Sequence, residues 1–172
     1  MERLQTDSIA REIDYLRIAY YLASKESPDL SIQNAALLVD PESGQILAYG
    51  VNTFPRGVNL THERLSRKPD KYLFTEHAER NAIYDAAKRG IKTAGLTMYC
   101  PWSACADCGR AIIQSGVALL VIHKIPEHDR PDWQASIKVA FDMFDEAHVP
   151  YRFITDKIGG VEIRFGARLL KP

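Results

Sequence analysis

The chain has 172 residues, of which 46% are hydrophobic, and its 22 basic and 22 acidic residues cancel to a formal net charge of zero. A length near 150 residues lets one domain bury about two thirds of its unfolded surface, so we expect a single domain over residues 1–172. The zero balance gives no electrostatic footprint for long nucleic acids or membrane surfaces, which leaves a small molecule as the expected partner.

The N-terminal stretch MERLQTDSIAREID is charged and lacks the apolar run of a signal peptide. The sequence also contains no run of about 18 apolar residues that would span a bilayer. We therefore expect a cytoplasmic protein without membrane contact. In a reducing compartment, a Cys-x-x-Cys motif indicates metal binding or redox activity rather than a structural disulfide.

The first half of the chain predicts one helix and a hairpin. Apolar residues at helical spacing predict an amphipathic helix over residues 8–25, with Ser8 as its N-cap. The runs AALLVD and QILAYGVN, joined by the turn PESG, predict two antiparallel strands. Residues 53–74 are polar, rich in Arg and interrupted by prolines, so we expect a long functional loop there.

Helix and strand alternate in the second half. The helix TEHAERNAIYDAAKRG is expected to begin at a capping Thr75, and the helix CADCGRAIIQSG at a capping Ser103. The other expected elements are strands at 95–100, 117–124 and 150–154, a helix over 133–147 and an extended segment at 161–170. This order predicts a three-layer α/β/α fold: a mixed five-stranded sheet with helices on both faces and parallel later strands.

Two of these helices begin with residue types that bind metals. His77 and Glu79 open one helix, and Cys105 and Cys108 lie one turn apart at the start of the other, so both sulfurs point the same way. One imidazole and two thiolates leave the fourth position of a tetrahedral zinc ion open, as in a catalytic site. We expect one Zn²⁺ per subunit, with Glu79 moving protons for a hydrolytic reaction.

Each of the two motifs is a weak signal when taken alone. His-x-Glu also fits a helix-cap histidine beside a solvated glutamate, and Cys-x-x-Cys also fits a thioredoxin-type redox pair. Together and in this order, each opening a helix with a strand between, they match the signature of zinc deaminases.

Over nearly its whole length the chain resembles the cytidine and deoxycytidylate deaminase superfamily, and within it most of all the deoxycytidylate (dCMP) deaminases. The segments that carry the resemblance are SPDLSIQNAALLVD, GVNTFPRGV, HAERNAI and MYCPWSACADCGRAIIQSGV. The resemblance implies a cytidine-deaminase-like fold, zinc ligation by His77, Cys105 and Cys108, and catalysis by Glu79. The implied reaction is hydrolytic deamination of a cytosine nucleotide, dCMP to dUMP, with release of ammonia.

The resemblance also implies a substrate site. The backbone of Ala78 would hold the pyrimidine carbonyl, and Asn52 would hydrogen-bond the sugar hydroxyl, although Asn52 also fits a turn residue at a strand end. Trp102 and Ser103 resemble the Ser-Trp-Ser-Pro-Cys segment of polynucleotide cytidine deaminases, where the aromatic residue flanks the target base. Packing at the rim is the alternative for Trp102.

For phosphate binding and pocket closure the sequence offers single candidate residues rather than a motif. The candidate cations for a 5′-phosphate are Arg56, Arg64, Lys71 and Arg130, each of which also fits a solvated surface charge. His128 and Trp133 are expected either to close the pocket or to cap and pack the following helix.

The sequence departs from the family pattern near the site. Ala104 stands where the family carries a proline before the first cysteine, Asn34 and Ala35 replace Val-Gly, and Thr53 replaces the glycine after Asn52. Three other functions stay open: a deaminase of another amino-bearing base or nucleoside, including a base in RNA or DNA; a catalytically silent binding subunit; and a redox protein. The resemblance implies a homo-oligomer, a dimer or hexamer.

Overall fold

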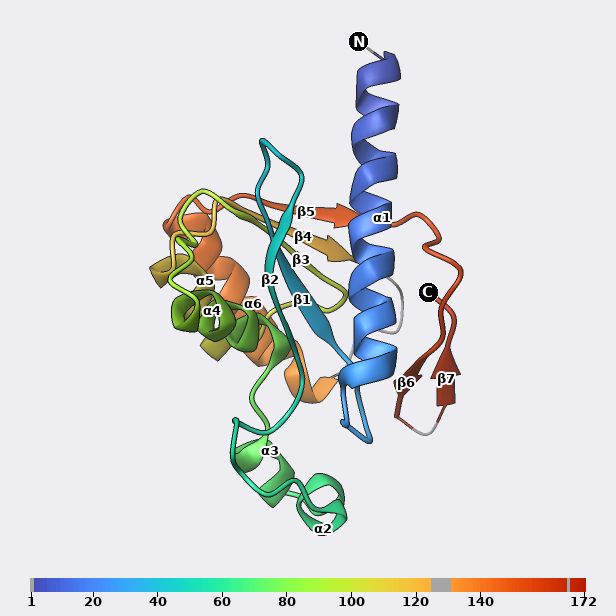
Figure 1. The fold of residues 1–172 in the computed structure, drawn as a ribbon, viewed down its shortest axis with the longest axis vertical. Helices are drawn as coiled ribbons and strands as arrows, with labels where there is room; N and C mark the ends of the chain where they lie inside the picture. The colour runs from blue at the N-terminus through green and yellow to red at the C-terminus, as the bar shows by residue number, and fades with distance from the viewer. Residues whose placement is uncertain (1, 125–130, 167) are drawn as a thin grey trace.

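A five-stranded sheet with the strand order β2-β1-β3-β4-β5 forms the centre of the structure, a computed structural model that describes residues 2–124, 131–166 and 168–172 (Figure 1). The strands are β1 (Ala35–Val39), β2 (Ile46–Val51), β3 (Thr97–Cys100), β4 (Leu119–His123) and β5 (Tyr151–Ile154). β1 pairs antiparallel with both β2 and β3, whereas β3, β4 and β5 run parallel. The predicted hairpin and the parallel later strands are thus confirmed.

Helices cover both faces of this sheet, as the sequence predicts. α1 (Glu2–Glu26) lies along one face, and α4 (Ala78–Lys88), α5 (Ala106–Gln114) and α6 (Pro131–Glu146) lie on the other (Figure 1). Successive strand residues alternate between the two layers: Leu37 packs in the core beneath α1, and Leu38 in the core beneath α4 and α5. No helix within the described ranges is both long and apolar enough to cross a membrane.

The predicted helix starts are wrong at three places. α1 begins at Glu2, so it runs through Ser8, because the residues before Ser8 include no proline or glycine to stop it. The N-cap of α4 is His77 in place of Thr75, and that of α5 is Cys105 in place of Ser103. A backbone bridge between Thr53 and Glu76 keeps the chain extended up to His77 and delays the start of α4.

The segment expected to be a loop, residues 53–74, contains two one-turn helices, α2 (His62–Ser66) and α3 (Asp70–Phe74). The hydroxyl of Thr61 caps α2 by accepting a hydrogen bond from the Arg64 N–H at 3.3 Å. Helices of five residues are too short to show a helical period in the sequence, which explains why the pattern misses them. In Figure 1 both lie at one end of the molecule, beyond the sheet.

The C-terminal extended segment forms a separate two-stranded sheet, β6 (Ile163–Phe165) with β7 (Arg168–Leu170). The hydrogen bonds that join it to the chain before β1 include those from the Gln33 N–H to the Arg164 carbonyl at 3.1 Å, from the Arg164 N–H to Gln33 Oε1 at 2.7 Å and from the Gly166 N–H to the Ser31 carbonyl at 2.5 Å. This docking brings Phe165 against Trp102, with ring centroids 4.9 Å apart.

β2 and α4 approach each other closely at Gly50. A Cβ atom at this position would lie 2.3 Å from the backbone nitrogen of Ala82 and 2.5 Å from the carbonyl oxygen of Ala78. Real Cβ contacts essentially never fall below 3.0 Å, and backbone atoms of a helix cannot move aside as a flexible side chain can. The absence of a side chain at Gly50 therefore fixes where the first turns of α4 lie on the sheet.

We predict that Gly50→Ala destabilises the protein by about 3 kcal/mol or more, because overpacking against backbone lies at the upper end of overpacking costs. Gly109→Ala is the matched control, since its new Cβ would meet the Ala140 Cβ at 3.0 Å and the end of the Met143 side chain at 3.4 Å. Urea unfolding of both variants checks the prediction; equal unfolding midpoints for the two would contradict it.

Candidate active site

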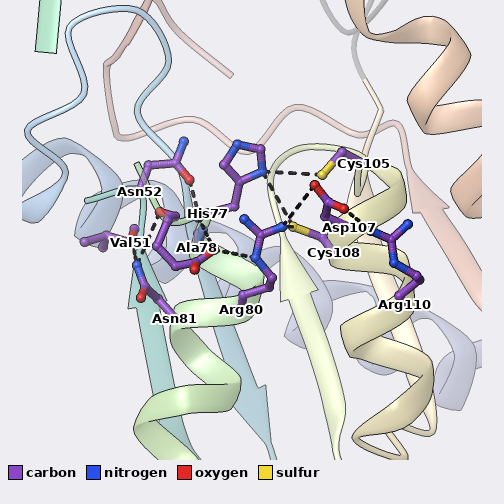
Figure 2. Close-up of polar contacts among 11 residues, drawn as sticks. Val51, Asn52, His77, Ala78, Arg80, Asn81, Cys105, Asp107, Cys108 and Arg110 are labelled. Carbon is purple, nitrogen blue, oxygen red and sulfur yellow. Dashed lines mark hydrogen bonds and ion pairs between the residues drawn. The ribbon is translucent and has the colours of Figure 1, made fainter. Parts of the chain in front are cut away.

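The site lies where the N-termini of α4 and α5 meet at one end of the sheet. His77 and Cys105 occupy the two N-cap positions, and neither makes a side-chain capping hydrogen bond. Their side chains therefore turn toward each other instead of back onto their helices. Figure 2 shows the imidazole of His77 facing both sulfurs, with its Nδ1 atom 3.5 Å from the Sγ atoms of Cys105 and Cys108.

The spacing of these three atoms fits one zinc ion. Donor atoms about 2.0–2.3 Å from a tetrahedral ion lie about 3.5 Å from one another, which matches the nitrogen-to-sulfur distances here. All three ligand atoms lie within 4.8 Å of one another, and among the residues that the structure describes no other His, Cys, Asp or Glu group meets this criterion. The chemistry of the set, one imidazole and two thiolates, is that of a zinc site.

The charges of the three residues depend on one another. A hydrogen bond from Cys108, together with His77, lowers the pKa of Cys105 to about 3, while the same contact with Cys105 and burial raise the pKa of Cys108. Burial lowers the pKa of His77, but its hydrogen bond to Cys105 and the nearby Glu79 outweigh this and raise it. The lowered pKa of Cys105 favours the thiolate, the form of cysteine that binds metal.

Arg80 is a cation beside the ligands that the motif search did not single out. Its guanidinium donates a hydrogen bond to Cys108 Sγ at 3.6 Å, which Figure 2 shows, and it forms an ion pair with the carboxylate of Glu76. Asp107 lies 4.0 Å away on its other side. Because Arg80 follows His77 by three residues, helical spacing alone places it on the same face, so this signal was available in the sequence.

Glu79 is buried beside the cluster. Only 2% of it is exposed, and its Oε2 atom has no hydrogen-bond partner among the described residues. Burial raises the pKa of this carboxyl group and outweighs the charge of the nearby His77, which lowers it; the negative Cys105 also raises it. A carboxyl group with an unpaired oxygen and a raised pKa, in reach of a metal site, is suited to accept and return a proton.

Asn52 and Ala78 are hydrogen-bonded to each other. The Ala78 N–H donates to Asn52 Oδ1 at 2.9 Å, and Asn52 Nδ2 donates to the Ile32 carbonyl at 3.1 Å. Both ends of this amide thus join β2 to α4 and to the chain before β1. The expected roles of these residues in substrate binding stay predictions, and a pyrimidine carbonyl would have to share the Ala78 N–H with Asn52.

A cavity opens beside the metal site, and two of the three candidate ligands, His77 and Cys105, line it. It encloses about 860 Å³, counted out to its open mouth, and His77, Glu79, Cys105 and Asn52 lie in its wall. Trp102, Ser103 and Trp133 also line it, as the sequence leads us to expect for residues near the substrate. The ring of Trp133 lies 5.6 Å from that of His77, and Trp102 donates from Nε1 to the Gln33 carbonyl at 3.0 Å.

The cations proposed for phosphate binding lie in different places. Lys71 lines the cavity and forms a buried ion pair with Asp29, whose Oδ1 atom is 2.6 Å from the lysine nitrogen. Arg56 is exposed, and Arg64 lies over the ring of Phe74. Neither arginine lines the cavity. Arg130 and His128 lie outside the residues that the structure describes.

Sequence reasoning missed several residues of the cavity wall. Lys68 and Tyr72 come from the segment around α3, Asp29 from the chain before β1, and Phe165 from the C-terminal sheet. The sequence could have indicated Lys68 as a further cation of the cavity, because it lies three residues before Lys71 in a basic stretch. Phe165 packs against Trp102, and no pattern in the sequence indicates this contact because the two residues lie more than sixty positions apart in the chain.

Comparison with known proteins gives consistent matches. Residues 10–124 match the family model described as the cytidine and deoxycytidylate deaminase zinc-binding region. The deoxycytidylate deaminase of Mus musculus is 29% identical over 164 residues, which cover 92% of this chain and 88% of the mouse protein. An uncharacterized deaminase from the luxG 3′ region of Aliivibrio fischeri is 33% identical over 128 residues, covering 74% of this chain and 83% of that protein.

The fold is similar to solved structures as well. The crystal structure of the dCMP deaminase of cyanophage S-TIM5 in its apo form superposes with a TM-score of 0.62 at 25% identity, covering 83% of this chain and 96% of the phage chain. A family match over most of the chain, together with the ligand geometry at His77, Cys105 and Cys108, identifies the class. The chain belongs to the cytidine and deoxycytidylate deaminase family of zinc-dependent hydrolases.

Proposed function

We propose that this protein deaminates a cytosine nucleotide, converting dCMP to dUMP and ammonia. The observation that carries the proposal is the pairing of a three-ligand zinc site with a buried carboxyl group whose Oε2 atom is unpaired among the described residues. A structural zinc site has four protein ligands and needs no such neighbour. The deoxycytidylate deaminases among the relatives support the choice of dCMP.

In the proposed reaction His77, Cys105 and Cys108 hold the metal, and Glu79 moves the proton. Zinc, when bound, supplies Lewis acidity that lowers the pKa of a water molecule. Glu79 accepts one proton from water and passes it to the ring nitrogen, and it then carries the second proton, from the hydroxyl group formed on the ring carbon, to the leaving amine. The water oxygen forms a bond to the ring carbon that carries the amino group, the bond from that carbon to nitrogen breaks, and ammonia leaves.

The cavity also suits the rest of a nucleotide. The aromatic ring of Trp133 offers a face for a base, Trp102 forms part of the wall, and the lysines Lys68 and Lys71 offer donors for a phosphate. Asp29 balances the charge of Lys71, whereas Lys68 is exposed and forms no ion pair with another residue that the structure describes. We therefore assign phosphate recognition to both lysines, with Lys68 providing the net attraction.

Three expectations from the sequence accompany this proposal. They are a single domain over residues 1–172, a homo-oligomer such as a dimer or hexamer, and a place in the cytoplasm.

The substrate assignment predicts a clear order in a panel of amino-bearing compounds. Release of ammonia from dCMP should exceed release from deoxycytidine, guanine or a cytosine-containing oligonucleotide by at least about tenfold in kcat/KM, because only the nucleotide combines a cytosine with a free 5′-phosphate. A coupled ammonia assay on the purified zinc protein measures this. Turnover of another panel member, with dCMP inert, would reject the assignment.

The roles assigned to the site residues predict that one substitution removes catalysis and keeps zinc, whereas another removes zinc. Glu79→Gln should retain zinc and lose at least about 100-fold in kcat, since general acid–base catalysis contributes about 10²–10⁴-fold. Cys108→Ala should lose zinc, because only two protein ligands remain. Elemental analysis beside the ammonia assay tests both, with Glu63→Gln on the surface of α2 as control. Full activity of Glu79→Gln would contradict the proton-transfer role.

The phosphate assignment predicts a selective loss. Lys68→Met should reduce kcat/KM for dCMP by about tenfold and leave deoxycytidine turnover nearly unchanged, because a hydrogen bond to a charged group contributes about 1.5–3 kcal/mol. Arg56→Met, outside the cavity, is the matched control and should change neither. Equal losses for both substrates in Lys68→Met would show that this residue does not act through the phosphate.

A further inference from the structure

Asn34 faces the same side of the sheet as the metal site. It directly precedes β1, where alternate residues point to opposite faces, and the next two even-numbered residues, Ala36 and Leu38, pack in the core beneath α4 and α5. Only 4% of Asn34 is exposed, and it lines the cavity together with His77 and Glu79. A buried amide thus stands in the cavity wall on the face of the candidate ligands.

The partners of this amide are weak ones. Asn34 Nδ2 donates to Cys100 Sγ at 3.4 Å, and the same thiol lies 3.7 Å from Asn34 Oδ1. A thiol is a poor donor and a poor acceptor, and within the described part of the chain no other group bonds to the amide. Burial, and then the charge of Glu79, raise the pKa of Cys100, so this thiol stays neutral and offers no stronger acceptor.

In the same wall, both ends of the Asn52 side-chain amide form hydrogen bonds with backbone groups. Its Oδ1 accepts from the Ala78 N–H and its Nδ2 donates to the Ile32 carbonyl, both at ordinary nitrogen-to-oxygen distances. The Ala78 N–H is therefore already paired within the protein. The carbonyl of a bound pyrimidine needs a hydrogen-bond donor, and of the two side-chain amides in this wall, Asn34 and Asn52, that of Asn34 is bonded only to a thiol.

We propose that Asn34 is a specificity-determining residue whose Nδ2 donates a hydrogen bond to the ring carbonyl of the pyrimidine. This inference rests on the proposed function, since it assigns a partner to the base of that substrate. A cavity that contains a buried donor discriminates against ligands that leave this donor unpaired. Asn34 would thereby select bases that carry a carbonyl oxygen next to the ring nitrogen.

The test compares dCMP with 2-thio-dCMP, in which sulfur replaces the carbonyl oxygen and accepts hydrogen bonds poorly. The wild-type zinc protein should prefer the oxygen compound by about tenfold or more in kcat/KM. Asn34→Leu, which has a similar shape and no donor, should lower kcat/KM for dCMP by about 5- to 100-fold and reduce the preference to within about threefold. Zinc content and the thermal midpoint are measured alongside.

Cys100→Ala is the matched control, because it removes the thiol and keeps the amide; the oxygen preference should persist. If Asn34→Leu does not fold, Asn34→Val serves instead, since its smaller apolar side chain also lacks a donor. A folded, zinc-loaded Asn34 variant that keeps the wild-type preference overturns the role of Asn34 alone. A wild-type protein inactive on both compounds overturns the proposed function, and the assignment of Asn34 falls with it.

Discussion

The meeting of two helix N-termini over the sheet is the constraint on which the rest of the structure depends. Each helix contributes its N-cap residue to the cluster, and Cys108 follows one turn into α5. The helix starts also direct positive ends at the thiolates, which favours the ionised form. Because a tetrahedral ion needs donors about 3.5 Å apart, an error of one helical residue in either start would separate them.

The neighbouring backbone holds these starts in place. The bridge between Thr53 and Glu76 ends two residues before Ala78, and the side chain of Asn52 accepts the first free N–H of α4. Gly50 admits the helix close to β2. Asn52 and Ala78, which the resemblance assigns to the substrate, therefore also determine the fold. The two amides of the cavity wall differ: Asn52 bonds to backbone groups at both ends, whereas Asn34 bonds only to the Cys100 thiol.

The sequence predicts the elements with a strong period and the residues whose chemistry is distinctive. The hairpin, the parallel strands and the covering of both faces follow from alternation of apolar residues, and His77, Glu79, Cys105 and Cys108 follow from motif order. The errors fall where local preference competes with tertiary contacts. Thr75 and Ser103 are better capping residues than histidine and cysteine, but the extended backbone before each helix excludes them from the cap. Phe165 enters the wall through a pairing with residues 32–33 that no local pattern encodes.

The cavity wall bears on whether a base within a polynucleotide or a free nucleotide is the better substrate. Trp102 is fixed on two sides, by stacking at 15° on Phe165 and by donating from its indole to the Gln33 carbonyl, and only 9% of it is exposed. An aromatic residue held in this way forms a rigid wall and leaves little surface for stacking a chain of bases. Polynucleotide binding also needs a positive groove along the strand, whereas this chain has zero net charge and Asp29 neutralises the buried Lys71. These features favour the proposed free nucleotide over a base within a polynucleotide.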